Sequence, residues 1–320
     1  MTKFKKHRSI IVSSPARIHL GFFGIENNYG YSFGSMGLAI NKHKTSVKIL
    51  NAHKFKTNLP KKFENKIKNI IKSTNISSRF EISLLNQLNS HIGLGSGTQT
   101  SLCIGKAISN YFNLNLTTYE LVNFFQRGLR SGTGIGIFEK GGFVLDSCKK
   151  VGEYPKIIIR KKFPADWRLI LVSDTDSKGS YFGIREKKFF LNDKSLKKHV
   201  SDLSHITLRG IIPSIMYEDY NYFVENIAEF QKITSLYYKK VQQGTFASKK
   251  ISIIMQYLKK MGIVGTGQSS WGPSSYIFAE STNHAKEIIN ILNNKFSMYN
   301  SLKYEIVKPN NSGYSLKHNN

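Results

Sequence analysis

A short stretch near residue 95 combines small, polar and conformationally free residues in a way that suits anion binding. Residues 91–108 read HIGLGSGTQTSLCIGKAI. Glycines at 93, 95 and 97 have no Cβ atom, so they allow a positive φ and a close approach to backbone N–H groups. From Leu102 onward the apolar residues recur at helical spacing. A glycine-rich loop that opens a helix directs unpaired N–H groups at one point, so the segment is predicted to bind an anion.

The spacing excludes two common nucleotide-binding motifs. A P-loop needs two glycines followed directly by Lys and Ser or Thr, and the first lysine here is Lys106, inside the predicted helix. The dinucleotide fingerprint needs a third glycine where Thr98 stands. The remaining alternative is a surface loop in which Thr98 caps a helix over residues 98–112.

Arginine is scarce in a strongly basic chain. The sequence holds 47 Lys and Arg against 20 Asp and Glu, but arginine occupies only nine positions. The lysines are spread along the chain beside abundant Asn and Ile, which indicates compositional bias, and no stripe of alternating Arg and aromatic residues predicts nucleic-acid binding. Only arginine offers a planar two-pronged donor. The candidates in or beside motif-like segments are Arg17, Arg127, Arg130, Arg168 and Arg185.

The surrounding pattern predicts an α/β chain of two domains, since 320 residues exceed the usual single core. We expect a first domain over residues 1–160, a second over 161–308, and a frayed polar tail over 309–320. Predicted strands lie at 9–20, 36–50, 79–85 and 141–146. Predicted helices lie at 61–75, 98–112, 117–128, 213–240 and 248–261.

The compartment is predicted to be the cytoplasm. The only apolar run near the start, Ile10 to Val12, is far too short for a signal peptide or a membrane span. Cys103 and Cys148 form neither a disulfide framework nor a metal-ligand spacing.

Five segments spread over residues 13–280 together form a recognisable set. They are SPARIHLG (14–21), HIGLGSGTQ (91–99), RGLRSGTGIGIFEKGGFVLD (127–146), FPADWR (163–168) and GTGQSSWGPSSY (265–276). Together they resemble the GHMP kinase superfamily and, within it, the branch of β-ribofuranosylaminobenzene 5′-phosphate synthases. The chain departs from the branch at Tyr31, near a turn that usually carries an arginine.

The resemblance implies a first domain like domain 2 of ribosomal protein S5 and a second, ferredoxin-like domain. It also implies an enzyme of methanopterin biosynthesis. Phosphoribosyl pyrophosphate would react with 4-aminobenzoate or 4-hydroxybenzoate and release pyrophosphate and carbon dioxide. Mg²⁺ would assist, and the protein would be a homodimer that binds neither nucleic acid nor membrane.

This chemistry assigns roles to particular residues. The glycine-rich loop would bind phosphate groups, and Arg17 or Arg130 would hold the benzoate carboxylate. Asp146 or Glu139 would stabilise a cationic sugar carbon. The phosphate-loop residues are Gly93, Gly95, Ser96, Gly97, Thr98 and Gln99. Further predicted substrate contacts are Ser131, Gln268, Ser269, Ser270 and Trp271, and Ser96 and Glu139 are the candidate magnesium ligands.

Each assignment has a structural alternative. Arg17 could brace a loop in an ion pair, and Glu139 and Asp146 could be solvated or could cap a helix. Trp271 could pack in the core. His19, a candidate acid or base, lies on an apolar strand, where a histidine is more often structural.

Two other functions stay open from the sequence. One is an ATP-dependent small-molecule kinase, against which Gly136 stands where such kinases place a carboxylate, although Glu139 or Asp146 could replace it. The other is a basic RNA-binding protein, suggested by the formal charge of +27. The sequence does not separate the amino- from the hydroxybenzoate.

Overall fold

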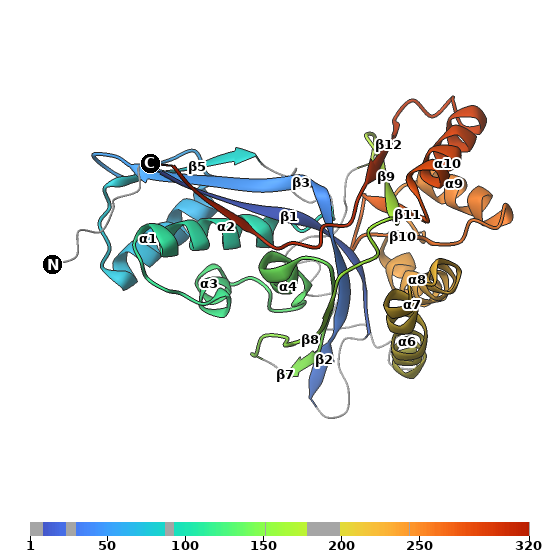
Figure 1. Cartoon of the computed structure of the whole chain (residues 1–320), viewed down its shortest axis with the longest axis horizontal. Helices are drawn as coiled ribbons and strands as arrows, with labels where there is room; N and C mark the ends of the chain where they lie inside the picture. The colour runs from blue at the N-terminus through green and yellow to red at the C-terminus, as the bar shows by residue number, and fades with distance from the viewer. Residues whose placement is uncertain are drawn as a thin grey trace.

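Two β-sheets flanked by helices make up the computed structural model, which describes residues 9–23, 30–86, 93–150, 152–177, 199–242 and 244–319 (Figure 1). The first half contains β1 (Ser9–Phe22), β2 (Tyr31–Phe33), β3 (Ser35–Asn51), β4 (Lys56–Thr57), α1 (Lys61–Thr74), β5 (Phe80–Asn86), α2 (Ser96–Tyr111), α3 (Thr118–Phe125), α4 (Thr133–Lys140), β6 (Phe143–Asp146), β7 (Cys148–Lys150) and β8 (Ile157–Lys161).

The second half continues with β9 (Arg168–Asp174), α6 (Val200–Ile206), the π-helical segment η2 (Thr207–Ile211), α7 (Ile212–Tyr217), α8 (Tyr220–Gln242), α9 (Lys249–Lys260), β10 (Thr266–Gln268), β11 (Ser275–Ala279), α10 (Thr282–Lys295), β12 (Leu302–Val307) and β13 (Ser315–Asn319). The helix predicted over 213–240 is divided into α7 and α8, because Glu218 adopts a left-handed conformation with φ of 57°.

The first sheet is built on two long antiparallel strands, β1 and β3. Its strand order is β13-β1-β3-β5-β4, and β6 joins β3 to β8. Alternate residues of a strand face the same side, so Ile10 and Val12 of β1 and Val47 and Ile49 of β3 form one core with α1 and α2. Figure 1 shows these helices along one face of the sheet. This packing places the start of α2 near the middle of β1.

The second sheet has the predicted ferredoxin-like arrangement. Its order is β10-β11-β9-β12, all antiparallel. Ile170 and Val172 of β9 pack against α9 and α10, whereas Leu169 and Leu171 pack against α8 in the other core. That second core also includes residues of β1 and β3, so the two sheets share a continuous apolar interior. Among the described helices, none combines the length and the apolar character that a membrane span needs.

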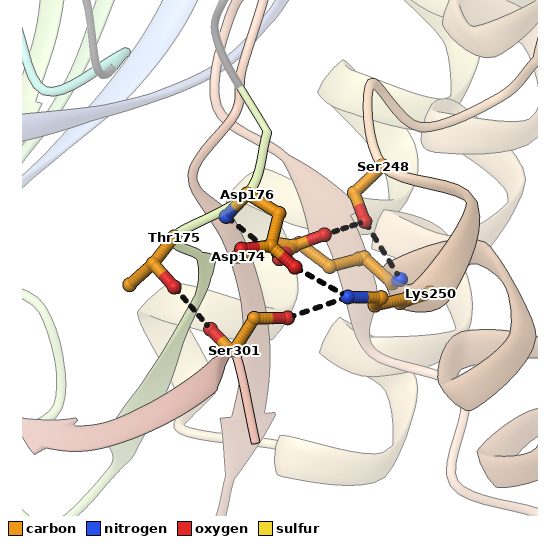
Figure 2. A network of polar contacts seen from close by, with 7 residues as sticks. Asp174, Thr175, Asp176, Ser248, Lys250 and Ser301 are labelled. Carbon is orange, nitrogen blue, oxygen red and sulfur yellow. Dashed lines mark hydrogen bonds and ion pairs between the residues drawn. The ribbon is translucent and has the colours of Figure 1, made fainter. Parts of the chain in front are cut away.

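A polar network fixes the end of β9 to the start of α9 (Figure 2). Ser248 caps α9 by accepting from the Ile251 N–H at 3.2 Å, and its hydroxyl donates to Asp174 at 2.6 Å. The Lys250 ammonium donates to Asp176 at 2.6 Å and to the Ser301 hydroxyl at 2.8 Å. These groups are occupied with one another, so the network stabilises this end of the second sheet.

The prediction of a frayed tail over residues 309–320 is wrong. β13 pairs with β1 from Ser9↔Asn319 to Ser13↔Ser315, and the Tyr314 ring stacks on Phe138 with centroids 4.6 Å apart. The Asn311 side chain donates to and accepts from the Phe163 backbone, both at 2.8 Å. The segment is polar because it is an edge strand held mainly by backbone hydrogen bonds, which leave no apolar pattern in the sequence.

Removal of residues 309–320 is therefore expected to destabilise the first domain. The deletion loses one ladder of backbone hydrogen bonds and the aromatic stack on Phe138, and together these contribute about 3 kcal/mol or more. Urea unfolding of the truncated chain measures the loss. Tyr314→Ala, which removes the stack but leaves the strand, should show a smaller decrease. A truncated chain with the wild-type midpoint would mean that β13 contributes nothing.

Candidate active site

β1 carries two of the predicted residues, Arg17 and His19, close to irregularities in its pairing. The register with β3 shifts between Ser14 and Ala16 and again between His19 and Gly21, and such bulges redirect side chains near functional sites. Ile18, between the two residues, faces the apolar core. Arg17 and His19 therefore project from the other face of the strand, toward the glycine-rich loop.

The glycine-rich loop ends at the start of α2, two residues earlier than predicted. Gly95, with φ of 79°, is the residue before the helix, and Ser96 is the first helical residue. Ser96, Gly97 and Thr98 are half-buried, and as the first residues of a helix their N–H groups have no intrahelical acceptor. The predicted anion-binding geometry is present, although Thr98 lies inside the first turn and is not its cap.

Arg17 lies directly against this loop. Its backbone N–H donates to the Leu94 carbonyl at 3.1 Å. A Cβ atom added to Gly95 would lie 2.7 Å from Arg17 Cγ. The absence of a side chain at Gly95 thus allows the Arg17 side chain to pass over the start of α2.

The turn between β10 and β11 closes the other side of the site. Ser269 Oγ accepts from the His19 N–H at 2.9 Å and donates to the Gly93 carbonyl at 2.7 Å. The Ser270 N–H donates to the His19 carbonyl at 3.4 Å. Ser269 therefore joins three segments that are far apart in the sequence.

Two residues of this turn, Gln268 and Trp271, contact other parts of the protein. The Gln268 side chain accepts from the Ala247 N–H at 2.7 Å and donates to the Ser270 carbonyl at 3.0 Å. The Trp271 side chain is 3% exposed, and its ring lies 4.9 Å from that of Tyr238. The structure thus supports the core-packing alternative for Trp271, and the predicted substrate contacts of Gln268 and Trp271 have no support from their placement.

A further arginine reaches the start of α2. The Arg127 guanidinium carbon would lie 3.4 Å from a Cβ atom at Gly97. Arg130 is close enough to Arg127 to act with burial in lowering its pKa. Arg168, in contrast, donates to the Ala165, Asp166 and Trp167 carbonyls and is structural; Arg185 lies outside the described residues.

His19 lies among these cations as a neutral imidazole. Burial is the main cause that holds its pKa well below 6.5, and Arg17 and Arg130 lower the pKa further. The residue is 5% exposed, and its Nδ1 atom has no hydrogen-bond partner among the described residues. At neutral pH the imidazole is uncharged and can exchange a hydrogen bond with a ligand.

Asp146 is an anchor for the second glycine-rich run. Its buried carboxylate accepts from Ser35 N–H and Oγ at 2.7 and 2.6 Å, and from the N–H groups of Gly132 and Thr133 at 2.5 and 3.0 Å. The Ser131 hydroxyl lies 2.7 Å from that of Ser35 and joins this cluster. Ser131 Oγ also donates to the carboxylate, at 3.4 Å. These donors fix the loop between Arg130 and α4 on Asp146, so its placement supports the structural alternative, and its catalytic role stays a prediction.

Asp146→Asn is expected to destabilise the fold by about 2 kcal/mol at pH 5, because its amide places a donor against the backbone N–H groups. Burial raises the wild-type pKa from 3.8 to about 6. A raised acid pKa means that the folded state binds the proton more tightly, so stability from this group is lost as pH rises through 6. The gap between the two proteins should narrow from pH 5 to 8 in urea unfolding. Asp166→Asn, at an exposed position, is the control, and a widening gap would contradict the assignment.

None of the contacts among the described residues joins Glu139 to Ser96. Gln99 Nε2 donates to the Gly134 carbonyl at 3.0 Å, so the first turn of α4 meets α2. Glu139 lies five residues further on, about 7.5 Å along the helix, with its carbonyl against Gly313. Among the described residues no group of three or more His, Cys, Asp or Glu side chains is placed to bind a metal. The predicted magnesium pair therefore has no geometric support.

Gln99 and Gly136 also differ from their predicted roles. Gln99 is fully buried and accepts from Ser14 Oγ at 2.5 Å, so it braces α2 against β1 and α4. A Cβ atom at Gly136 would lie 2.8 Å from Val144 and 3.1 Å from Ile157. That position faces the apolar core, so the lack of a carboxylate there is no argument against a kinase.

The sequence did not predict that Arg127 lies against α2 or that Ser35 binds Asp146. Arg127 did carry a signal, since it is one of few arginines and lies in RGLRSG. Ser35 had none, because it meets Asp146 only through the pairing of β3 with β6.

Known proteins share both sequence and fold with this chain. Residues 58–138 match the family model of the GHMP kinases N terminal domain. A protein of Methanocaldococcus jannaschii named β-ribofuranosylphenol 5′-phosphate synthase is 28% identical, covering 96% of this chain and 100% of its own. A protein of the same name from Methanothermobacter thermautotrophicus is 27% identical, covering 83% of this chain and 88% of its own.

Solved structures agree on the fold. Mevalonate-3-kinase of Thermoplasma acidophilum with mevalonate bound superimposes with a TM-score of 0.71 at 14% identity, covering 98% of this chain and 100% of its own. The predicted resemblance is confirmed: the chain has the fold of the GHMP kinase superfamily and is a relative of the β-ribofuranosylphenol 5′-phosphate synthases.

Proposed function

We propose that this enzyme condenses phosphoribosyl pyrophosphate with 4-hydroxybenzoate and releases pyrophosphate and carbon dioxide. The observation that carries the proposal is the position of Arg17 and Arg127 against the start of α2, with the charge of Arg130 acting on both His19 and Arg127. Such a site suits a substrate pair with several anionic groups. The names of the relatives specify a phenol product, which corresponds to the hydroxybenzoate and favours it over the aminobenzoate.

The site offers distinct groups to the two substrates. The free N–H groups at the start of α2, with the Ser96 and Thr98 hydroxyls, suit phosphate oxygens. The Arg17 fork suits the benzoate carboxylate. The neutral His19 can bind a hydroxyl group without adding charge. Together these groups would hold the ring carbon that bears the carboxylate against C1 of the ribose.

The reaction balances without an external acid or base. The bond between C1 and the pyrophosphate oxygen breaks, and pyrophosphate leaves with the electron pair. The ring carbon then bonds to C1, which interrupts aromaticity. Loss of carbon dioxide returns its electron pair to the ring and makes the step irreversible. The donors at α2 stabilise the charge that develops on the leaving group.

We also propose that the reaction uses Mg²⁺ bound near Ser96. Mg²⁺ in phosphate sites keeps several waters and takes few protein ligands, and the Ser96 hydroxyl at the start of α2 is of the right chemical class. When bound there, the ion would neutralise charge on the departing pyrophosphate. From the same family resemblance we propose a homodimer that acts in the cytoplasm in methanopterin biosynthesis.

The test is an assay of products with carboxyl-labelled 4-hydroxybenzoate. Labelled carbon dioxide and pyrophosphate should appear in equal amounts only when phosphoribosyl pyrophosphate and Mg²⁺ are present, and ATP should not be consumed. Parallel reactions with 4-aminobenzoate decide the substrate through the product mass. Pyrophosphate without carbon dioxide would indicate a hydrolase or an O- or N-ribosyltransferase. ADP formation with a small alcohol would indicate a kinase, and salt-dependent RNA binding without turnover would indicate an RNA-binding protein.

A further inference from the structure

Arg127 is held beside α2 by the end of α3. A capping box of Thr117 and Glu120 fixes the start of this helix. At its other end Gln126 turns left-handed with φ of 50°, its N–H donates to the Asn123 carbonyl at 3.0 Å, and the Arg127 N–H donates to the Val122 carbonyl at 2.9 Å. This pair of bonds is a Schellman motif. The backbone of Arg127 is thus set by the helix end and not by a loose loop.

The surroundings of Arg127 are cationic. Its guanidinium lies against Gly97 in the first turn of α2, at the positive end of the helix dipole. Arg130 and Lys66 are its charged neighbours, because Arg130 contributes to the lowered pKa of Arg127 and Arg127 contributes to that of Lys66, in each case after burial. Arg127 and Lys66 are half-buried and Arg130 is exposed. Cations of like sign oppose one another, so an anion bound here would relieve their repulsion.

A second observation places a ligand next to these cations. The Nδ1 atom of the buried His19 has no partner among the described residues. Arg17 and Arg130 both lower its pKa, so the positive charges of both arginines act on the imidazole. An unsatisfied buried nitrogen costs free energy unless a ligand pairs with it.

We infer that Arg127, Arg130 and the first turn of α2 form a subsite for the diphosphate group of the sugar substrate, separate from the carboxylate subsite at Arg17. The inference rests on the proposed function for the identity of that substrate. The assignment follows the charge. A diphosphate carries more negative charge than a carboxylate, and the half-buried Arg127 lies against the first turn of α2 with the charge of Arg130 acting on it. Arg127 is then a specificity residue, and His19 between the subsites would bind a ribose hydroxyl.

The test measures binding without turnover, by titration calorimetry with inorganic pyrophosphate and, separately, with 4-hydroxybenzoate. Arg127→Gln should raise the Kd of pyrophosphate at least tenfold and leave that of 4-hydroxybenzoate unchanged. Arg127→Lys, which keeps the charge without the fork, should lie between. Arg79→Gln removes the same charge from an exposed position just before β5 and should change either Kd less than twofold.

Gly97→Ala is a second variant that tests the same subsite and is expected to remain folded. Its Cβ would meet the Arg127 guanidinium at 3.4 Å, an ordinary contact, and alanine favours a helix. The variant should keep the wild-type melting temperature but bind pyrophosphate more weakly. Wild-type pyrophosphate binding in a folded Arg127→Gln variant, or selective loss of that binding in Arg17→Lys, would overturn the inference. If the product assay fails while Arg127→Gln still loses pyrophosphate, the proposed function falls and the subsite stands.

Discussion

Gly95→Ala is expected to lower kcat/KM for phosphoribosyl pyrophosphate by about a hundredfold, which corresponds to about 2.7 kcal/mol of transition-state stabilisation. Gly95 has φ of 79°, and its added methyl would come within 2.7 Å of Arg17 Cγ. Arg17 would have to leave its place over the start of α2. The same methyl would also obstruct the approach of a phosphate group to the N–H groups of the first turn.

Gly262 provides a matched control. It has the same φ of 79°, but a Cβ atom there meets nothing within 4 Å. Gly262→Ala should therefore show the same backbone strain, about 1–2 kcal/mol in urea unfolding, with wild-type kcat/KM. Equal activity losses in the two variants would mean that strain, and not the position of Arg17, causes the effect.

Arg17→Lys is expected to lower kcat/KM for 4-hydroxybenzoate ten- to a hundredfold. Lysine keeps the positive charge but cannot form two parallel hydrogen bonds to a carboxylate, a difference of about 1.5–3 kcal/mol. The change should appear mainly in the KM of the benzoate. Arg79→Lys, at an exposed position, should behave as wild type. If Arg17→Lys retains full activity, Arg17 has only a structural role, which is the alternative that the sequence left open.

The sequence predicted the parts of the site that depend on local pattern. The glycine-rich run and the apolar period after Leu102 indicated the loop and helix of the anion site. The hydrogen bond between His19 and Ser269 was not predicted, because residues 250 apart give no local signal.

What could not be predicted depends on packing between elements. Nothing in the pattern of α4 shows that Gly136 faces Val144, since a helix of glycines and isoleucines has several apolar faces. The donors to Asp146 come from two places: Ser35 through the pairing of β3 with β6, and Gly132 and Thr133 from the start of α4. The sequence specifies neither. β13 was missed because an edge strand needs no apolar alternation.

The return of β13 to β1 makes the second domain an insertion within the first. The chain leaves the first sheet after Lys161, builds the second sheet from Arg168 to Val307, and comes back to pair with its own beginning at Ser9 (Figure 1). The ferredoxin-like domain is thus tethered by two crossings instead of one linker. A single cut in either crossing would leave the two domains joined by the other crossing and by the apolar interior that they share.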